Sequence, residues 1–124
     1  MEKKKIFIVD DDAAVLNSLK ELLVFSGFEV GTTQNPREAF KEIKDFGPHL
    51  ILLDLLMPHI GGLEICEMLN NDRQTQGIPI IVVSALVKEA DIKKAYQLGI
   101  VGYITKPYDF QNLLHEINKA ITSK

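Results

Sequence analysis

Short apolar runs alternate with longer stretches of helical spacing along the whole chain. The runs are rich in Val, Ile and Leu and have the length of strands. Five of them are recognisable, at residues 5–9, 29–33, 50–53, 79–83 and 101–105. Between the runs, apolar residues recur at every third or fourth position, which is the spacing of one buried helix face. The pattern therefore predicts a strand–helix unit repeated five times.

Capping signals mark where the expected helices begin and end. Asp12 and Asp109 can each accept backbone N–H groups at the start of the first and last helices. Asn35, with a proline directly after it, is a typical start for the second helix. Gly27 and Gly99 stand just after two expected helix ends. The third and fourth helices are expected around residues 62–71 and 88–98, where the apolar face is less regular.

Near-continuous apolar strands are typical of a parallel sheet that helices cover on both faces. Residues 50–53 and 80–83 contain no polar side chain. With the strand–helix alternation, this predicts a doubly wound α/β fold, a (βα)5 sandwich around a five-stranded parallel sheet. A chain of 124 residues has the length of one such domain. We therefore expect a single domain over residues 1–124 with no appended output domain.

The composition argues against several classes of function. Fourteen Lys and Arg against seventeen Asp and Glu give a net charge of -3, which disfavours direct nucleic-acid binding. The apolar runs fall far short of the ~20 residues of a membrane span, and no signal-peptide core is visible, so a cytoplasmic protein is expected. The lone Cys66 excludes an internal disulfide and is expected in the core. His49, His59 and His115 lack ligand spacing and are expected in solvated or structural roles.

Polar residues follow the expected strands at the edge where parallel sheets usually carry their sites. Asp10, Asp11 and Asp12 follow the first strand, Asp54 the third and Lys106 the fifth. Clustered carboxylates repel one another by about 4 kcal/mol per close pair at an effective dielectric near 20, so a divalent cation is implied. An all-oxygen ligand set suits Mg²⁺. The Lys106 ammonium could then pair with a carboxylate or a phosphoryl oxygen.

Four motifs in this order resemble the receiver domain of two-component response regulators over essentially the whole chain. They read IFIVDDD at 6–12, LDLLMP at 53–58 with GG at 61–62, VSA at 83–85 and GYITKP at 102–107. The resemblance implies a flavodoxin-like sheet in the order 2-1-3-4-5. It also implies that Asp54 is the phosphoacceptor. Asp10, Asp11, Asp54 and the Leu56 backbone carbonyl would hold Mg²⁺, with Asp11 bound directly and Asp10 through water.

The resemblance further implies a switch that reads the phosphorylation state. Ser84 would move to bond the phosphoryl group, and Tyr103 would turn inward and reshape the face of the fourth helix, fifth strand and fifth helix. Lys106 would form a salt bridge to the phosphoryl group, and the peptide bond before Pro107 would be cis. Asp12 departs from the ligand role and is expected to be a helix N-cap first.

Two apolar residues bear on the lifetime of the phosphorylated state. Leu56 and Leu86 stand two positions after Asp54 and Ser84, where receivers flank the path of water to the aspartyl phosphate. Neither side chain can orient an attacking water, and both can obstruct one. The sequence therefore predicts slow self-dephosphorylation unless a phosphatase supplies a polar group.

The implied partners are a histidine kinase or histidine phosphotransfer protein and a downstream protein target, with no direct nucleic-acid or membrane partner. The chain is expected to be a monomer or a phosphorylation-dependent dimer. It could act as a diffusible switch, as a phosphorelay intermediate or as part of a longer regulator. An acceptor of this kind assists its own phosphorylation and dephosphorylation but is not an ordinary enzyme.

Three other classes of function fit part of the sequence, but each fits it less well than a receiver domain does. A haloacid-dehalogenase-type phosphatase would use the Asp-x-Asp after the first strand, but only the isolated Asp109 and Glu116 follow Lys106, and no length remains for a cap domain. A flavodoxin would need hydroxyls and amides after the first strand, where three aspartates would repel the flavin phosphate. An interaction module that never carries phosphate would usually lack the acceptor, the acid pair or the lysine, and all are present.

Overall fold

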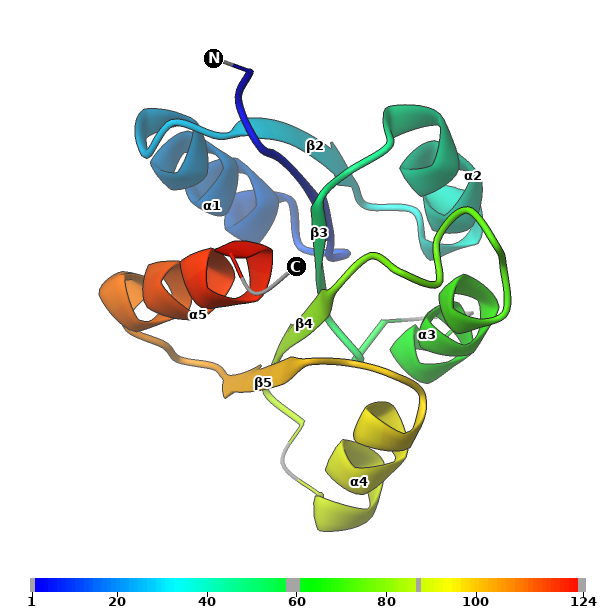
Figure 1. The fold of residues 1–124 in the computed structure, drawn as a ribbon. Coiled ribbons are helices and arrows are strands. Elements are labelled where there is room, and N and C mark those ends of the chain that lie inside the picture. Colours follow the sequence, from blue (N-terminus) through cyan, green and yellow to red (C-terminus); the bar gives the residue numbers. More distant parts are fainter. Residues whose placement is uncertain (1, 58–60, 87, 123–124) are drawn as a thin grey trace.

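The structure, a computed structural model, describes residues 2–57, 61–86 and 88–122, and strands alternate with helices along it (Figure 1). The strands are β1 (Lys5–Val9), β2 (Glu29–Thr33), β3 (Leu50–Leu53), β4 (Ile80–Ser84) and β5 (Gly102–Thr105). The helices are α1 (Ala13–Phe25), α2 (Pro36–Phe46), α3 (Gly62–Asn70), α4 (Glu89–Gln97) and α5 (Phe110–Thr122). The expected five strand–helix units are confirmed. In the part of the chain that the structure describes, no helix is long and apolar enough to cross a membrane.

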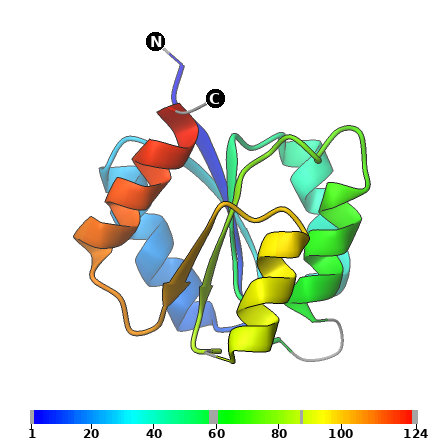
Figure 2. The ribbon, with the colours of Figure 1, turned by 60° about the horizontal axis from the view of Figure 1, so that its bottom comes forward.

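The sheet is parallel throughout and its strands lie in the order β2-β1-β3-β4-β5. Helices α1 and α5 lie on one face, and α2, α3 and α4 cover the other (Figures 1 and 2). This confirms the doubly wound fold and the strand order that the resemblance implied. The chain leaves β1 toward one edge of the sheet for β2 and then crosses back to β3, so the carboxyl ends of β1 and β3 flank the switch point, where ligands bind in such sheets.

Two strands have limits that differ by one residue from those expected. Strand β4 covers 80–84 rather than 79–83, because Pro79 has no N–H for the ladder, whereas the Ser84 carbonyl accepts the Lys106 N–H at 2.9 Å. Strand β5 begins at Gly102 rather than Val101. The correction matters for the site, because it makes Ser84 the last residue of a buried central strand.

The expected helix caps are present. At the start of three helices a side chain accepts backbone N–H groups of the first turn at 2.9–3.3 Å. The residues that do this are Asp12, Asn35 and Asp109. Gly27 and Gly99 follow the ends of α1 and α4 with φ angles of 103° and 98°. Gly47 ends α2 in the same left-handed region, a stop that the apolar pattern had not indicated.

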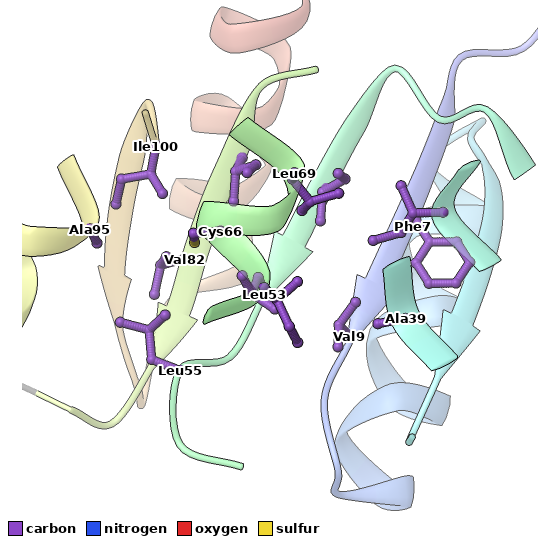
Figure 3. Packing of buried hydrophobic residues seen from close by; sticks show 14 residues of the cluster. Phe7, Val9, Ala39, Leu53, Leu55, Cys66, Leu69, Val82, Ala95 and Ile100 are labelled. Carbon is purple, nitrogen blue, oxygen red and sulfur yellow. The ribbon is translucent and has the colours of Figure 1, made fainter. Parts of the chain in front are cut away.

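Two apolar clusters hold the helices against the sheet. Figure 3 shows the cluster between the sheet and α2, α3 and α4, in which strand residues such as Val9 and Val82 pack with helix residues such as Ala39 and Cys66. The second cluster joins α1 and α5 to the opposite face. Cys66 is fully buried in the first cluster, and this burial raises the pKa of its thiol to about 12. Its expected role as a small core residue is confirmed.

Gly31 in β2 is expected to tolerate no side chain. An added Cβ would lie 2.9 Å from Cδ2 of Phe7 and 3.1 Å from Cε1 of Phe46, two rings that pack edge to face. We expect Gly31→Ala to lower the free energy of unfolding by about 1–3 kcal/mol, the usual cost of overpacking. Gly102→Ala in β5 is the matched control, because its Cβ would meet Ile81 at ordinary distances of 3.6 and 3.8 Å. Urea unfolding followed by circular dichroism compares the two, and equal stability would contradict the steric interpretation.

Candidate functional site

Polar side chains stand together at the carboxyl edge of the sheet. Asp10, Asp54 and Lys106 directly follow β1, β3 and β5, and Ser84 ends β4. Because neighbouring strands are parallel, these ends lie along one edge. Asp10, Asp54 and Ser84 are only 3%, 7% and 0% exposed. Buried polar groups at this edge need partners within the protein, and the contacts below provide them.

The Lys106 ammonium bridges two carboxylates. Its Nζ lies 2.8 Å from Oδ2 of Asp10 and 3.0 Å from Oδ2 of Asp54. The second oxygen of each carboxylate accepts a backbone N–H in its own loop, from Asp12 at 3.0 Å and from Leu56 at 2.9 Å. Each carboxylate is therefore fixed at both oxygens. This geometry is in line with the sequence prediction that Asp10, Asp54 and Lys106 lie close together.

The burial and pairing of these charges shift their pKa values. Burial raises the pKa of the Asp10 carboxyl, and hydrogen bonds from Lys106 and Asp12 offset only part of that effect. For Lys106, burial lowers the pKa, but the hydrogen bonds to Asp10 and Asp54 outweigh it and raise the pKa above its ordinary value. Lys106 is thus a charged ammonium at neutral pH. It stands beside a carboxylate whose ionised form is costly to bury.

The carboxylates also form a donor set for a cation. Oxygens of Asp10, Asp11 and Asp54 all lie within 4.8 Å of one another, with Asp11 exposed and the other two buried. Hard carboxylate oxygens with one side open to solvent fit Mg²⁺. Asp12 points its carboxylate at the first turn of α1 instead, as its expected capping role requires. The Leu56 carbonyl stays a predicted ligand.

The side chains of Ser84 and Tyr103 both form hydrogen bonds to the backbone of Leu86. Oγ of Ser84 accepts the Leu86 N–H at 3.2 Å, and the Tyr103 hydroxyl donates to the Leu86 carbonyl at 2.5 Å. Burial raises the pKa of the Tyr103 phenol, which therefore remains a neutral donor. The peptide bond between Lys106 and Pro107 is cis, as the resemblance implied.

The histidines contribute nothing to this cluster in the part of the chain that is described. Nδ1 of His49 accepts the backbone N–H of Lys5 at 2.9 Å, at the amino end of β1 and thus far from the carboxyl edge. His115 is exposed on α5. His59 and Pro58 of the third-strand motif lie outside the described residues. For His49, the expected structural role agrees with this contact.

Two contacts at the site had no distinct sequence signal. Nε2 of Gln34 donates to the Asp11 carbonyl at 3.3 Å and so joins the loop after β2 to the loop after β1. Gly62 begins α3 directly against the backbone of Asp54 and Leu55. The glycine pair was part of a recognised motif, but only the packing distinguishes the two glycines.

Comparisons with known proteins agree on one family. The family model described as the response regulator receiver domain matches residues 6–118. The chain is 34% identical over 117 residues to the transcriptional regulatory protein CrdR of Helicobacter pylori, covering 94% of this chain and 54% of CrdR. It is 32% identical over 118 residues to the polar-differentiation response regulator DivK of Brucella anthropi, covering 95% of this chain and 96% of DivK. The chain thus spans about half the length of CrdR and nearly all of DivK.

A solved structure gives the same result. The CheY-like response regulator receiver domain protein from Methanospirillum hungatei matches with a TM-score of 0.93 at 30% identity. The match covers 98% of this chain and 96% of that chain. The likeness therefore extends over nearly the whole length of both chains.

Asp10 is expected to lower the stability of the metal-free protein at neutral pH. Because its pKa is raised in the folded state, folding favours the protonated carboxyl, and this contribution is lost as the pH rises through that pKa. Asp10→Asn cannot ionise and is therefore expected to be more stable than the wild type in EDTA at neutral pH. The difference should shrink as the pH falls toward the ordinary carboxyl value of 3.8. Urea titrations across this pH range measure it.

Asp12→Asn is the matched control for this prediction. It removes one negative charge from the same loop, but Asp12 is exposed and asparagine caps a helix as well as aspartate does. Its stability should stay within about 0.5 kcal/mol of the wild type. If Asp10→Asn proved less stable than the wild type at neutral pH, the lost pairing with Lys106 would dominate and the prediction would be wrong.

Proposed function

Because the chain belongs to the response regulator receiver family of two-component signalling, we propose that it is a phosphorylation switch with Asp54 as the phosphoacceptor. The observation that carries this proposal is the Lys106 ammonium, 3.0 Å from Asp54 and 2.8 Å from Asp10. A carboxylate beside a fixed cation can receive a phosphoryl group, because the incoming negative charge meets a positive partner. The proposed phosphodonor is a histidine kinase or a histidine phosphotransfer protein.

The proposed transfer forms one bond and breaks one. A carboxylate oxygen of Asp54 attacks the phosphorus of a donor phosphohistidine whose second ring nitrogen is protonated, the P–N bond breaks with its electron pair staying on the ring, and the imidazole leaves as neutral histidine. Hydrogen bonds from Leu56 and Lys106 hold both Asp54 oxygens, so the carboxylate is oriented before the donor arrives. Lys106 then pairs with a phosphoryl oxygen, because the negative charge now lies there.

Mg²⁺ is the proposed cofactor, and the close oxygens of three carboxylates support it. Asp10, Asp11 and Asp54 would hold the ion together with the Leu56 backbone carbonyl. When bound, Mg²⁺ supplies positive charge that offsets the repulsion among the carboxylates and the charge on the phosphoryl oxygens. As the resemblance to receivers implies, Asp11 is the proposed direct ligand and Asp10 is proposed to bind through water; Asp11 is the exposed member of the three.

The proposed output uses the shared contact of Ser84 and Tyr103 with Leu86. If Oγ of Ser84 turns to donate to a phosphoryl oxygen, it gives up the Leu86 N–H that it accepts at 3.2 Å. Leu86 then moves, and the Tyr103 hydroxyl loses its carbonyl partner and turns into the space that Ser84 leaves. The surface of α4, β5 and α5 changes as a result. A downstream protein target would read this change.

The rest of the proposed biology follows from the same switch. We propose one receiver domain over residues 1–124 that is cytoplasmic and that signals by protein contact rather than by direct nucleic-acid binding. The net charge of -3 supports the last point. The domain would be a monomer, or a dimer that forms on phosphorylation. It would assist its own phosphorylation and dephosphorylation without being an enzyme for another substrate.

The proposed acceptor is tested by intact mass after incubation with acetyl phosphate. We expect the wild type to gain one phosphoryl group with Mg²⁺ and none in EDTA, because the carboxylate cluster then lacks its cation. Asp54→Asn should gain none in either condition. Phosphorylation of Asp54→Asn to the same extent as the wild type would exclude Asp54 as the acceptor. No gain in the wild type with either acetyl phosphate or a histidine phosphodonor would exclude the proposed function.

The predicted long phosphoryl lifetime is tested by replacing the two apolar residues beside the acceptor. Leu56 is 49% exposed and Leu86 partly buried. The double variant Leu56→Asn and Leu86→Gln should lose phosphate about tenfold faster or more, because an amide can orient an attacking water. Its matched control, Leu56→Met and Leu86→Met, keeps the apolar character and should decay like the wild type. Decay of the radiolabelled proteins measures the rates, and unchanged decay in the amide variant would contradict the prediction.

A further inference from the structure

Gly62 is packed so closely on the acceptor strand that it has no room for a side chain. A Cβ at this position would lie 2.6 Å from the Asp54 carbonyl oxygen and 2.6 Å from Cα of Leu55. Both are backbone atoms, so the conflict could be relieved only by moving the chain. The φ angle of Gly62 is outside the left-handed region, so conformational freedom is not the reason for glycine here. The reason is steric.

The backbone that Gly62 contacts is the segment that carries the acceptor. The Asp54 N–H donates to the Val9 carbonyl at 3.0 Å, which ties the segment to β1 on one side. The Gly62 N–H donates to the Leu55 carbonyl at 3.3 Å, which ties it to α3 on the other. The Leu56 N–H closes back on Oδ1 of Asp54 at 2.9 Å. Residues 54–56 are therefore held between a strand and a helix start.

We propose that Gly62 is a positioning residue for the phosphoacceptor. Because it lacks a Cβ, α3 begins in direct contact with the peptide unit between Asp54 and Leu55. That contact holds the peptide units on both sides of Leu55, and with them the Asp54 carboxylate that faces Lys106 and the Leu56 N–H that donates to it. The expected effect on phosphorylation rests on the proposed function, whereas the close contact of Gly62 with Asp54 and Leu55 does not depend on it.

The neighbouring glycine provides a matched control. Gly61 precedes α3 with φ of -76° and ψ of 154°, values that alanine adopts freely, and among the described residues a Cβ there would meet no atom within 4 Å. Gly61→Ala and Gly62→Ala thus make the same chemical change one residue apart, at the start of α3. Only the second would displace residues 54–56.

The experiment compares both variants with the wild type by two measurements. With saturating acetyl phosphate and Mg²⁺, the maximal phosphorylation rate of Gly62→Ala should fall by about tenfold to a hundredfold, because a shift of about 1 Å in a reacting group can cost that much. The half-saturating phosphodonor concentration should change little. The amide proton resonance of Leu56, which reports its hydrogen bond to Asp54, should move in Gly62→Ala. Gly61→Ala should match the wild type in both.

The outcomes separate this inference from the proposed function. A wild-type rate and an unmoved Leu56 resonance in folded Gly62→Ala would overturn the positioning role. A lower melting temperature with both readouts unchanged would also overturn it, since Gly62 would then be merely structural. If no protein is phosphorylated while the Leu56 resonance moves only in Gly62→Ala, the proposed function fails and the steric positioning stands.

A second pair of variants keeps the test decisive if Gly62→Ala does not fold. The added Cβ would also lie 2.8 Å from Cδ2 of Leu55. Leu55→Ala removes that side-chain atom and gives the helix start room to move. The double variant Leu55→Ala and Gly62→Ala is then compared with Leu55→Ala alone. A slower maximal rate and a shifted Leu56 resonance in the double variant support the positioning role, and equal values overturn it.

Discussion

The Lys106 ammonium between two buried carboxylates is the interaction on which the whole site depends. Its partners Asp10 and Asp54 lie 96 and 52 positions away in the sequence, so the contact forms only after the parallel sheet has brought three strand ends together. Burying charge is costly even when it is paired. The raised pKa of Asp10 is the sign that pairing does not fully offset burial here. The apolar clusters on both faces of the sheet must therefore stabilise an edge that is electrostatically unfavourable without a cation.

In the proposed function, that imbalance would make the site responsive. A group of carboxylates that lacks enough positive charge gains most from an added cation, and a fixed ammonium would gain a new partner if a phosphoryl group arrived. The backbone of Leu86 would link this chemistry to the surface, because Ser84 and Tyr103 hold its N–H and its carbonyl respectively. Gly62 packs directly on the backbone of Asp54 and Leu55, so under the positioning role proposed above a displacement at Asp54 would pass to its neighbours.

Much of the fold could be predicted because its signals are local. Apolar runs of strand length, an aspartate before a helix and a glycine after one act within a few residues, and the structure has each of them where the pattern indicated. The predicted strand limits were wrong where a residue distant in the sequence decides the strand pairing. The carbonyl of Ser84 joins β4 because Lys106, directly after β5, donates to it. Gly47 closes α2 with a φ of 65°, although no apolar period ends there in a recognisable way.

The sequence by itself determined the residue types at the ends of the strands, and its motifs carried the resemblance to the receiver family that implied the strand order. It could indicate that Asp10, Asp54 and Lys106 meet, because parallel strands share one carboxyl edge. Only the tertiary structure decided which carboxylate oxygens pair with the ammonium and which of two adjacent glycines touches the acceptor segment. The physical reason is the same in each case. Burial, pKa and steric room depend on atoms that are distant in the chain and become neighbours only when the sheet and helices pack.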